Sequence, residues 1–275
     1  MTNIFLQPLS YEFMQRGLAA SVIVGILCSV IGCYVVLRSM AFLGDALAHA
    51  ILPGVAISYL VGGNLMIGAL IAAIIVALSI GFFSRQGTIR EDTAIGVLFS
   101  AALALGIALI STMRTYAVDL SHILFGNVLG VSSNELIQII GLAVIILGIV
   151  IIFYRPFMII SFDPILATTL RLPAEALRIL LLILVSLTIV ASLQTVGIGL
   201  VAAMLVTPAA AAYLLTNRLS RMMVVSASIG VFSSLVGLFA SYYINIASGA
   251  AIVLVATLVF ILAFLFSPRR GIIKL

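Results

Sequence analysis

Tryptophan is absent from this 275-residue chain, lysine occurs once, and charged residues make up only 8% of the sequence. Apolar residues make up 64%, and the mean hydropathy is +1.41. A soluble domain of this length needs far more charged surface. The composition therefore excludes a soluble globular protein and predicts a polytopic membrane protein.

The scarcity of lysine also excludes one class of function. A Walker phosphate-binding loop ends in Lys-Ser or Lys-Thr after a glycine-rich turn, whereas the single lysine, Lys274, precedes Leu275. We therefore expect that the chain is not an enzyme and does not hydrolyse ATP by that route.

Cysteine is almost as scarce, and both cysteines lie on the first apolar segment. Cys28 and Cys33 are five residues apart, which places them about 140° apart around a helix. They can then share neither a metal nor an easy disulfide, and we expect two buried, unpaired thiols. The N-terminus has no basic region or A-x-A site, so we expect no cleaved signal peptide, and residues 1–14 resemble a short interfacial helix.

Nine apolar runs are long enough, or nearly so, to cross a bilayer. They lie at about 17–37, 41–61, 65–83, 94–111, 134–154, 177–194, 196–215, 222–244 and 247–266. A shorter run at 120–131 contains Gly126, Asn127 and Gly130 and suits a re-entrant segment. The sequence thus predicts one all-α polytopic membrane domain over residues 1–275, with about eight to nine transmembrane helices, a re-entrant segment and broken helices.

The basic residues indicate how these spans are oriented. With nine spans and a cytoplasmic C-terminus, 11 of the 13 basic residues lie inside, and only Arg16 and Arg114 lie outside. This distribution explains the net charge of +5 as a membrane topology signal. We therefore expect no nucleic acid partner.

The longest polar connection, at 155–178, lies on the cytoplasmic side in this topology and contains a possible short helix. Asp163 can cap the helix, Pro164 suits its first position, and Pro173 stops it after Leu172. Such a short helix is marginal alone, so it either rests on the membrane surface or docks on a partner. Its apolar side would consist of Ile165, Leu166, Thr169, Leu170 and Leu172.

Two spans carry a proline followed by small residues. The second contains Pro53 and Gly54, and the seventh contains Pro208 before three alanines. Interrupted helices in corresponding halves of a transporter often mark its substrate site. The pattern suggests helix breaks near a pathway, although proline kinks are common in membrane helices.

Asp45 and His49 are the ionisable pair within an apolar span. Their i, i+4 spacing places both side chains on one helix face, where an oxygen and a nitrogen can bind Mn²⁺, Fe²⁺ or Zn²⁺. Alternatively, Asp45 caps a helix near the interface and His49 bonds to a neighbour. Ionisable groups inside a span are functional candidates by default.

Two further pairs of ionisable residues are better explained by structural roles. Asp119 and His122, at i, i+3 on the outer side, could line a vestibule or form a hydrogen-bonded turn, and we favour the turn. Glu91 and Asp92 lie at a helix start, where they favour the helix dipole and can pair with Arg85 or Arg90.

Five stretches resemble, in order, the membrane permease of bacterial ATP-binding-cassette (ABC) transporters that import manganese, zinc or iron. They span residues 40–215 and read MAFLGDALAHAILPGVAISYL, REDTAIGVLFSAALALG, LSHILFGNVLGVS, SFDPILATTLRLP and QTVGIGLVAAMLVTPAAAAYLL. The histidine followed by AILPG is more similar to the manganese and iron branch than to typical zinc permeases.

The resemblance implies a permease in the bacterial cell membrane that transports Mn²⁺, or alternatively Zn²⁺ or Fe²⁺, with no permanently bound cofactor. It implies a homodimer with two cytoplasmic ATPase subunits and an extracytoplasmic solute-binding protein that delivers metal. Asp45 and His49 match the family's intramembrane metal pair, and residues 162–172 match its coupling helix. The coupling residues would be Phe162, Asp163, Pro164, Leu166, Leu170, Arg171 and Leu172.

Two alternatives belong to other classes. A gradient-driven secondary transporter would use Asp45 and His49 as a relay, and its metal uptake would survive loss of any ATPase. An intramembrane metalloprotease would need H-E-x-x-H, which the sequence lacks, and no glutamate lies near His49 to act as a base.

Overall fold

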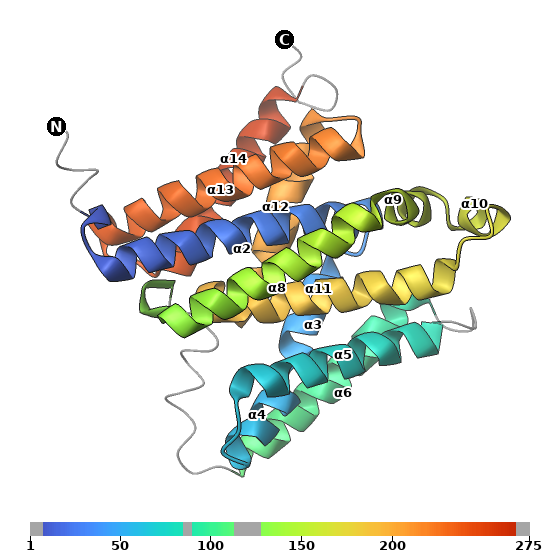
Figure 1. The fold of residues 1–275 in the computed structure, drawn as a ribbon, viewed down its shortest axis with the longest axis horizontal. Helices are drawn as coiled ribbons and strands as arrows, with labels where there is room; N and C mark the ends of the chain where they lie inside the picture. Colours follow the sequence, from blue (N-terminus) through green and yellow to red (C-terminus); the bar gives the residue numbers. More distant parts are fainter. Residues whose placement is uncertain (1–7, 85–89, 113–127, 268–275) are drawn as a thin grey trace.

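The computed structural model describes residues 8–84, 90–112 and 128–267, and these residues form helices without any strand (Figure 1). The helices are α2 (Glu12–Leu37), α3 (Phe42–Ala50), α4 (Leu52–Leu60), α5 (Leu65–Ser84), α6 (Glu91–Ser111), the 3-10 turn η1 (Val128–Gly130), α8 (Ser133–Ile152), α9 (Tyr154–Phe162), α10 (Pro164–Thr169), α11 (Ala174–Val196), α12 (Ile198–Leu215), α13 (Leu219–Ile244) and α14 (Ser248–Phe266).

The long helices are the predicted spans. Eight segments within the described residues are long and apolar enough to cross a membrane, with α3 and α4 together forming one of them. The helix α12 is a ninth, shorter apolar helix, as the hydropathy predicts. The prediction of an all-α polytopic membrane fold is therefore confirmed, with boundaries within a few residues of those expected.

Helix α2 lies at the centre of the bundle, between α13 and α11 (Figure 1). Small residues let it approach α13 closely: a Cβ added at Gly25 would lie only 2.9 Å from the carbonyl oxygen of Gly230. The hydroxyls of Ser226 and Ser234 donate to α2 carbonyls across the same interface, at 3.0 and 2.8 Å. Small residues and interhelical hydroxyl bonds are typical of helix packing in membranes.

The two cysteines lie inside this packing. Cys28 and Cys33 are both fully buried and free. The Sγ of Cys33 donates to the carbonyl of Ser29 one turn earlier, at 3.2 Å. The prediction that both are buried, unpaired thiols is confirmed.

One of the two expected proline breaks is present and the other is not. The second span is interrupted at Ile51, and Pro53 lies in the first turn of α4, where its missing N–H is not needed. Pro208 instead lies inside α12, and the helix continues through it, so the expectation of a break there is wrong. The interruption in this part of the chain is Gly197, whose φ of +81° separates α11 from α12.

Other predicted segments begin at different residues than expected, or lie partly or wholly outside the described part of the chain. Helix α2 begins at Glu12, so the last residues of the expected interfacial helix belong to the span, while residues 1–7 lie outside the described part. The expected re-entrant run is described only from Val128, where η1 packs against Gly17 of α2. Asp119, His122 and Arg85 lie outside the described residues.

Candidate metal site and coupling segment

Helix α3 presents a single polar stripe. From Leu43 to Ala50 every α3 residue except this pair is buried, whereas the side chains of Asp45 and His49 remain 41% and 26% exposed. Close packing on the opposite side fixes this orientation, because a Cβ at Gly44 would meet the Ala202 backbone of α12 at 3.4 Å. The two ionisable side chains therefore face away from the chain's own core.

The imidazole of His49 is oriented by contacts to Asp45 and Phe99. Its Nδ1 lies 3.0 Å from the Asp45 carbonyl oxygen and 3.6 Å from Asp45 Oδ1. The ring also meets Phe99 of α6 edge to face, with 5.9 Å between centroids. A carbonyl only accepts, so Nδ1 donates this hydrogen bond, and in a neutral imidazole with this tautomer Nε2 has the lone pair that metal binding requires.

One chain supplies an incomplete ligand set. No group of three or more histidine, cysteine, aspartate or glutamate side chains that could hold a metal occurs among the residues described. Transition metals in proteins usually take four or more ligands. The sequence-predicted pair is thus brought together, and it offers two side chains that could each supply a donor atom to a metal.

Pro53 and Gly54 shape the helix that follows this pair. Gly54 packs directly on Gly68 of α5, where no Cβ would fit. Both residues line an apolar cavity of about 330 Å³ between α4, α5 and α6. The break at Ile51 therefore separates a half-helix carrying polar groups, α3, from a tightly packed apolar one, α4.

Helix α10 begins as the sequence predicts. Asp163 caps it, with Oδ1 accepting hydrogen bonds from the N–H groups of Ile165 and Leu166 at 2.9 and 3.0 Å, and Pro164 follows in the first turn. Phe162, Leu166 and Leu170 are exposed, and Ala167 is buried. An exposed apolar ridge on so short a helix is typical of a surface that a partner covers.

The end of α10 differs from the prediction. The helix stops at Thr169 rather than Leu172, because Arg171 adopts a left-handed φ of +55°. The N–H of Arg171 then donates to Thr168 and that of Leu172 to Ala167, both at 3.0 Å, which is a Schellman ending. Sequence reasoning also missed α9, the amphipathic helix that joins α8 to α10.

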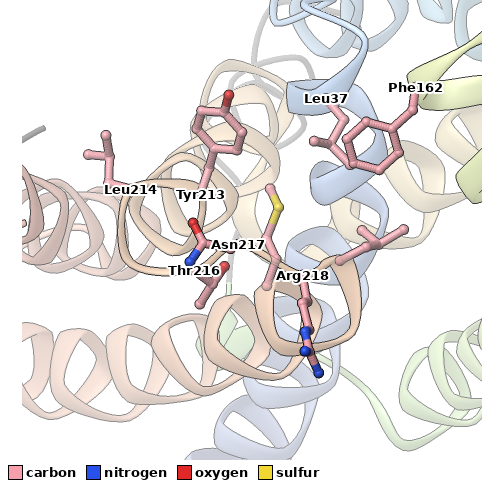
Figure 2. A pocket seen from close by; sticks show the side chains of 9 residues that line it. Leu37, Phe162, Tyr213, Leu214, Thr216, Asn217 and Arg218 are labelled. Atoms are coloured by element: carbon pink, nitrogen blue, oxygen red, sulfur yellow. The ribbon is translucent and has the colours of Figure 1, made fainter. Parts of the chain in front are cut away.

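A pocket opens beside this segment. It has a volume of about 250 Å³ and lies where α2, α9, α12 and α13 converge. Figure 2 shows Leu37 and Phe162 on one side of it and Tyr213 and Asn217 on the other. Phe162 thus contributes both to the apolar surface around α10 and to the wall of this pocket.

Glu91 pairs with arginines that are distant in the sequence, and Arg85, one of its two predicted partners, lies outside the described residues. Its carboxylate pairs with Arg38, at 3.0 Å, and with Arg178, at 3.5 Å, while Arg90 is the residue before the helix. Arg38 and Arg178 are 53 and 87 positions away in the sequence. Local spacing carries no signal for such contacts, so only the tertiary structure reveals them.

Comparison with known proteins identifies the family. The model of the ABC 3 transport family matches residues 10–267. The manganese transport system membrane protein MntC of Halalkalibacterium halodurans is 51% identical over 99% of this chain and 94% of its own length. The manganese import system permease protein ScaB of Streptococcus gordonii is 39% identical over 100% and 99%, respectively. A probable iron transport system membrane protein of Haemophilus influenzae is 40% identical over 98% of this chain and 99% of its own length.

Solved structures agree with this assignment. The structure of PsaBC from Streptococcus pneumoniae in complex with Fab superposes with a TM-score of 0.87 and 39% identity, covering 98% of both chains. An inward-facing putative metal-chelate type ABC transporter shares the fold, with a TM-score of 0.72 and 15% identity over 91% of this chain and 85% of that one. The chain therefore belongs to the ABC 3 transport family and is a multi-pass membrane permease of the bacterial ABC importer type.

Proposed function

We propose that this permease moves Mn²⁺ into the bacterial cytoplasm and that Asp45 and His49 bind the ion during transport. The observation that carries the proposal is the half-exposed acid–histidine pair on the interrupted second span. Relatives at 50–51% identity are named for manganese transport, whereas those named for iron are 38–40% identical. This difference favours manganese over iron as the substrate.

The donor set supports a divalent transition metal. A carboxylate oxygen and an imidazole nitrogen suit Mn²⁺, Fe²⁺ and Zn²⁺, and suit soft Cu⁺ less well. Because the pair faces away from its own chain, a second copy related by a twofold axis could complete an O₂N₂ site. The incoming cation would compensate the two carboxylates, which are otherwise costly in a membrane.

The exposed ridge of α10 supports an ATPase partner. Phe162, Leu166 and Leu170 present apolar surface next to a helix too short to be stable alone. A separate cytoplasmic ATPase subunit would cover this surface, since the sequence has no Walker loop. Binding and hydrolysis of ATP would shift the permease between conformations open to either side.

The arginines support a cytoplasmic location for α10. In Figure 1 α10 lies at the end of the bundle where α2 and α9 end and α11 begins, and α2 begins, with Arg16 in its second turn, at the other end. The remaining described arginines border helices at the α10 end: Arg38, Arg90, Arg155, Arg171, Arg178, Arg218 and Arg221. By the positive-inside rule this end faces the cytoplasm, so metal would arrive from an extracytoplasmic binding protein at the opposite end.

Metal content of cells tests the proposal. Bacteria with and without the protein are grown in limiting metal, and cellular Mn, Fe and Zn are measured together. We expect manganese alone to fall when the permease or its ATPase is absent. A fall in cellular zinc or iron with unchanged manganese would mean that zinc or iron, and not manganese, is the substrate. Uptake that survives loss of the ATPase would indicate a gradient-driven transporter.

A further inference from the structure

Four charged side chains form a network where α2, α5, α6 and α11 converge, at the α10 end of the bundle. Nη2 of Arg38 donates to Oε2 of Glu91 at 3.0 Å, and Nη1 of Arg178 lies 3.5 Å from Oε1 of the same carboxylate. Nη2 of Arg178 donates to Glu175. Arg38 and Arg178 are each only 14% exposed and Glu91 is 21% exposed, so solvent screens these charges little.

Along the chain, the residues of the network lie close to the α10 segment on one side and to Asp45 and His49 on the other. Arg178 lies in the second turn of α11, six residues after Leu172 at the end of the α10 segment. Arg38 ends α2, and Asp45 follows it by seven residues. Glu91 begins α6, and Phe99, which contacts the His49 ring, lies eight residues further along the same helix.

The connection to α3 is short and defined. Ser39 adopts a left-handed φ of +56°, and the N–H groups of Ser39 and Met40 donate to Val36 and Val35, each at 3.0 Å. This is a Schellman ending, and it leaves only Met40 and Ala41 before α3. A displacement of Arg38 would therefore also displace α3, because the connection between the two is so short.

Arg178 is also bound to α5. Its Nη1 donates to Ser84 Oγ at 2.6 Å and its Nη2 to the Gly81 carbonyl at 3.0 Å. Next to it, Ile179 fills the space over Gly81, where a Cβ would lie 2.8 Å away. The first turns of α11 thus move with α5 as one packed unit.

Two buried polar atoms of this network lack hydrogen bonds in the described part of the chain: Oε1 of Glu91 and Nε of Arg178. A guanidinium and a carboxylate satisfy such atoms when they pair through two parallel N–H···O bonds. Arg178 instead divides its bonds between Glu175 and α5. Arg178 and Glu91 therefore do not form two parallel hydrogen bonds in this conformation. A movement of α11 that brings the two side chains closer would allow these bonds to form.

We propose that Glu91 is a positioning residue that couples movement of α10 and α11 to α3, through its contacts with Arg178 on one side and Arg38 on the other. This inference rests on the proposed function, because it assigns a route between the ATPase surface and the metal pair. Without the Glu91 charge, Glu175 alone is left to balance the two buried guanidiniums, and Arg38 loses its contact with a carboxylate. Arg178 of α11 and Arg38, which precedes α3, then no longer share an ion-pair partner.

The test uses the permease with its ATPase and binding protein in liposomes. Glu91→Gln removes the charge with little change in shape, and Arg38→Gln breaks only the α3 side of the network. The matched control is Asp92→Asn, which removes an exposed carboxylate from the adjacent position of the same helix turn. Two quantities are measured: Mn²⁺ transported per ATP hydrolysed, and the ratio of the Mn²⁺ dissociation constants with and without a non-hydrolysable ATP analogue.

We expect Glu91→Gln and Arg38→Gln to lower Mn²⁺ transported per ATP by about tenfold, a size typical of allosteric coupling. The Mn²⁺ affinity of both variants should no longer respond to the analogue, while Asp92→Asn behaves as wild type. A purely structural role would lower complex yield and both activities in parallel without changing either ratio, and that result would overturn the proposal.

Three further outcomes are decisive. If Glu91→Gln does not assemble, Glu91→Asp keeps the charge on a shorter side chain, and failure of that variant to assemble as well would mean a structural role only. If Glu91→Gln transports like Asp92→Asn, the coupling role is wrong and the proposed function stands. A wild-type complex that imports no Mn²⁺, Fe²⁺ or Zn²⁺ would instead overturn the proposed function and the coupling role together.

Discussion

Nδ1 of His49 donates to the backbone carbonyl of Asp45, 3.0 Å away, so that one residue of the proposed metal pair orients the ring of the other. The carboxylate Oδ1 of Asp45 lies 3.6 Å from the same nitrogen. The contact with Asp45 and the edge-to-face contact with Phe99 together hold the ring on the partly exposed face of α3. A metal that binds both side chains of the pair must approach from the open side of the helix.

The first prediction concerns zinc. Zn²⁺ binds a given nitrogen–oxygen site more tightly than Mn²⁺, following the Irving–Williams order. Release is part of transport, and tight binding slows it. We expect Zn²⁺ to bind the permease at least as well as Mn²⁺, to be transported more slowly and to inhibit Mn²⁺ uptake. Uptake assays with each metal alone and together measure this, and faster transport of Zn²⁺ at saturating delivery would identify a zinc importer.

The second prediction concerns the exposed ridge. Leu170 is 54% exposed beside α10, and Leu170→Asp would bury an unpaired carboxylate in any apolar groove that covers it. We expect the variant to lose its ATPase in a pull-down. Thr168→Asp introduces the same charge at an exposed polar position of the same helix and serves as control. Retention of the ATPase and of transport by Leu170→Asp would mean that the segment rests on lipid.

The third prediction concerns the cap of α10. Loss of an aspartate N-cap costs about 1 kcal/mol, which is about a fivefold loss in the population of the folded helix. We expect Asp163→Ala to weaken ATPase binding by a similar factor, since docking requires the helix. Asp163→Asn keeps a capping oxygen and should bind nearly normally. Equal affinities of Asp163→Ala and wild type, measured by titration, would show that the cap plays no part in docking.

The fourth prediction concerns packing of α2. A methyl group at Gly25 would lie 2.7 Å from Ser234 Oγ and 2.9 Å from the Gly230 carbonyl, so Gly25→Ala overpacks the interface and should cost about 1–3 kcal/mol. Gly141 of α8 has open space at the same position. Thermal unfolding in detergent should therefore show a lower Tm for Gly25→Ala but not for Gly141→Ala. Equal Tm values for the two variants would contradict close contact between α2 and α13.

The sequence predicts well what depends on hydropathy and on local caps. Lipid imposes long apolar helices, so the spans are found within a few residues, and Asp163 followed by Pro164 defines the start of α10. The i, i+4 spacing of Asp45 and His49 likewise places both on one face, as the structure shows. These features are set by residues close together in the chain.

Features set by distant residues are not predictable in this way. Arg171 takes a left-handed conformation without being glycine, so the early end of α10 has no sequence signal. Pro208 looks like Pro53 in sequence, yet α12 continues through it, because neighbouring helices and local adjustments can satisfy the backbone groups that a proline frees. The Glu91 network joins residues 38, 91 and 178, which only the fold brings together.

The most direct test of the central claim is Mn²⁺ uptake into liposomes containing the permease, its ATPase and its binding protein, with Asp45→Ala and His49→Ala compared with wild type. The free energy of inserting alanine into the membrane is lower than that of inserting the original residues, so membrane insertion and ATPase binding should be unchanged. We predict that each variant loses ATP-dependent Mn²⁺ uptake almost completely. Near-normal uptake by both variants would contradict the assignment of Asp45 and His49 as the metal ligands.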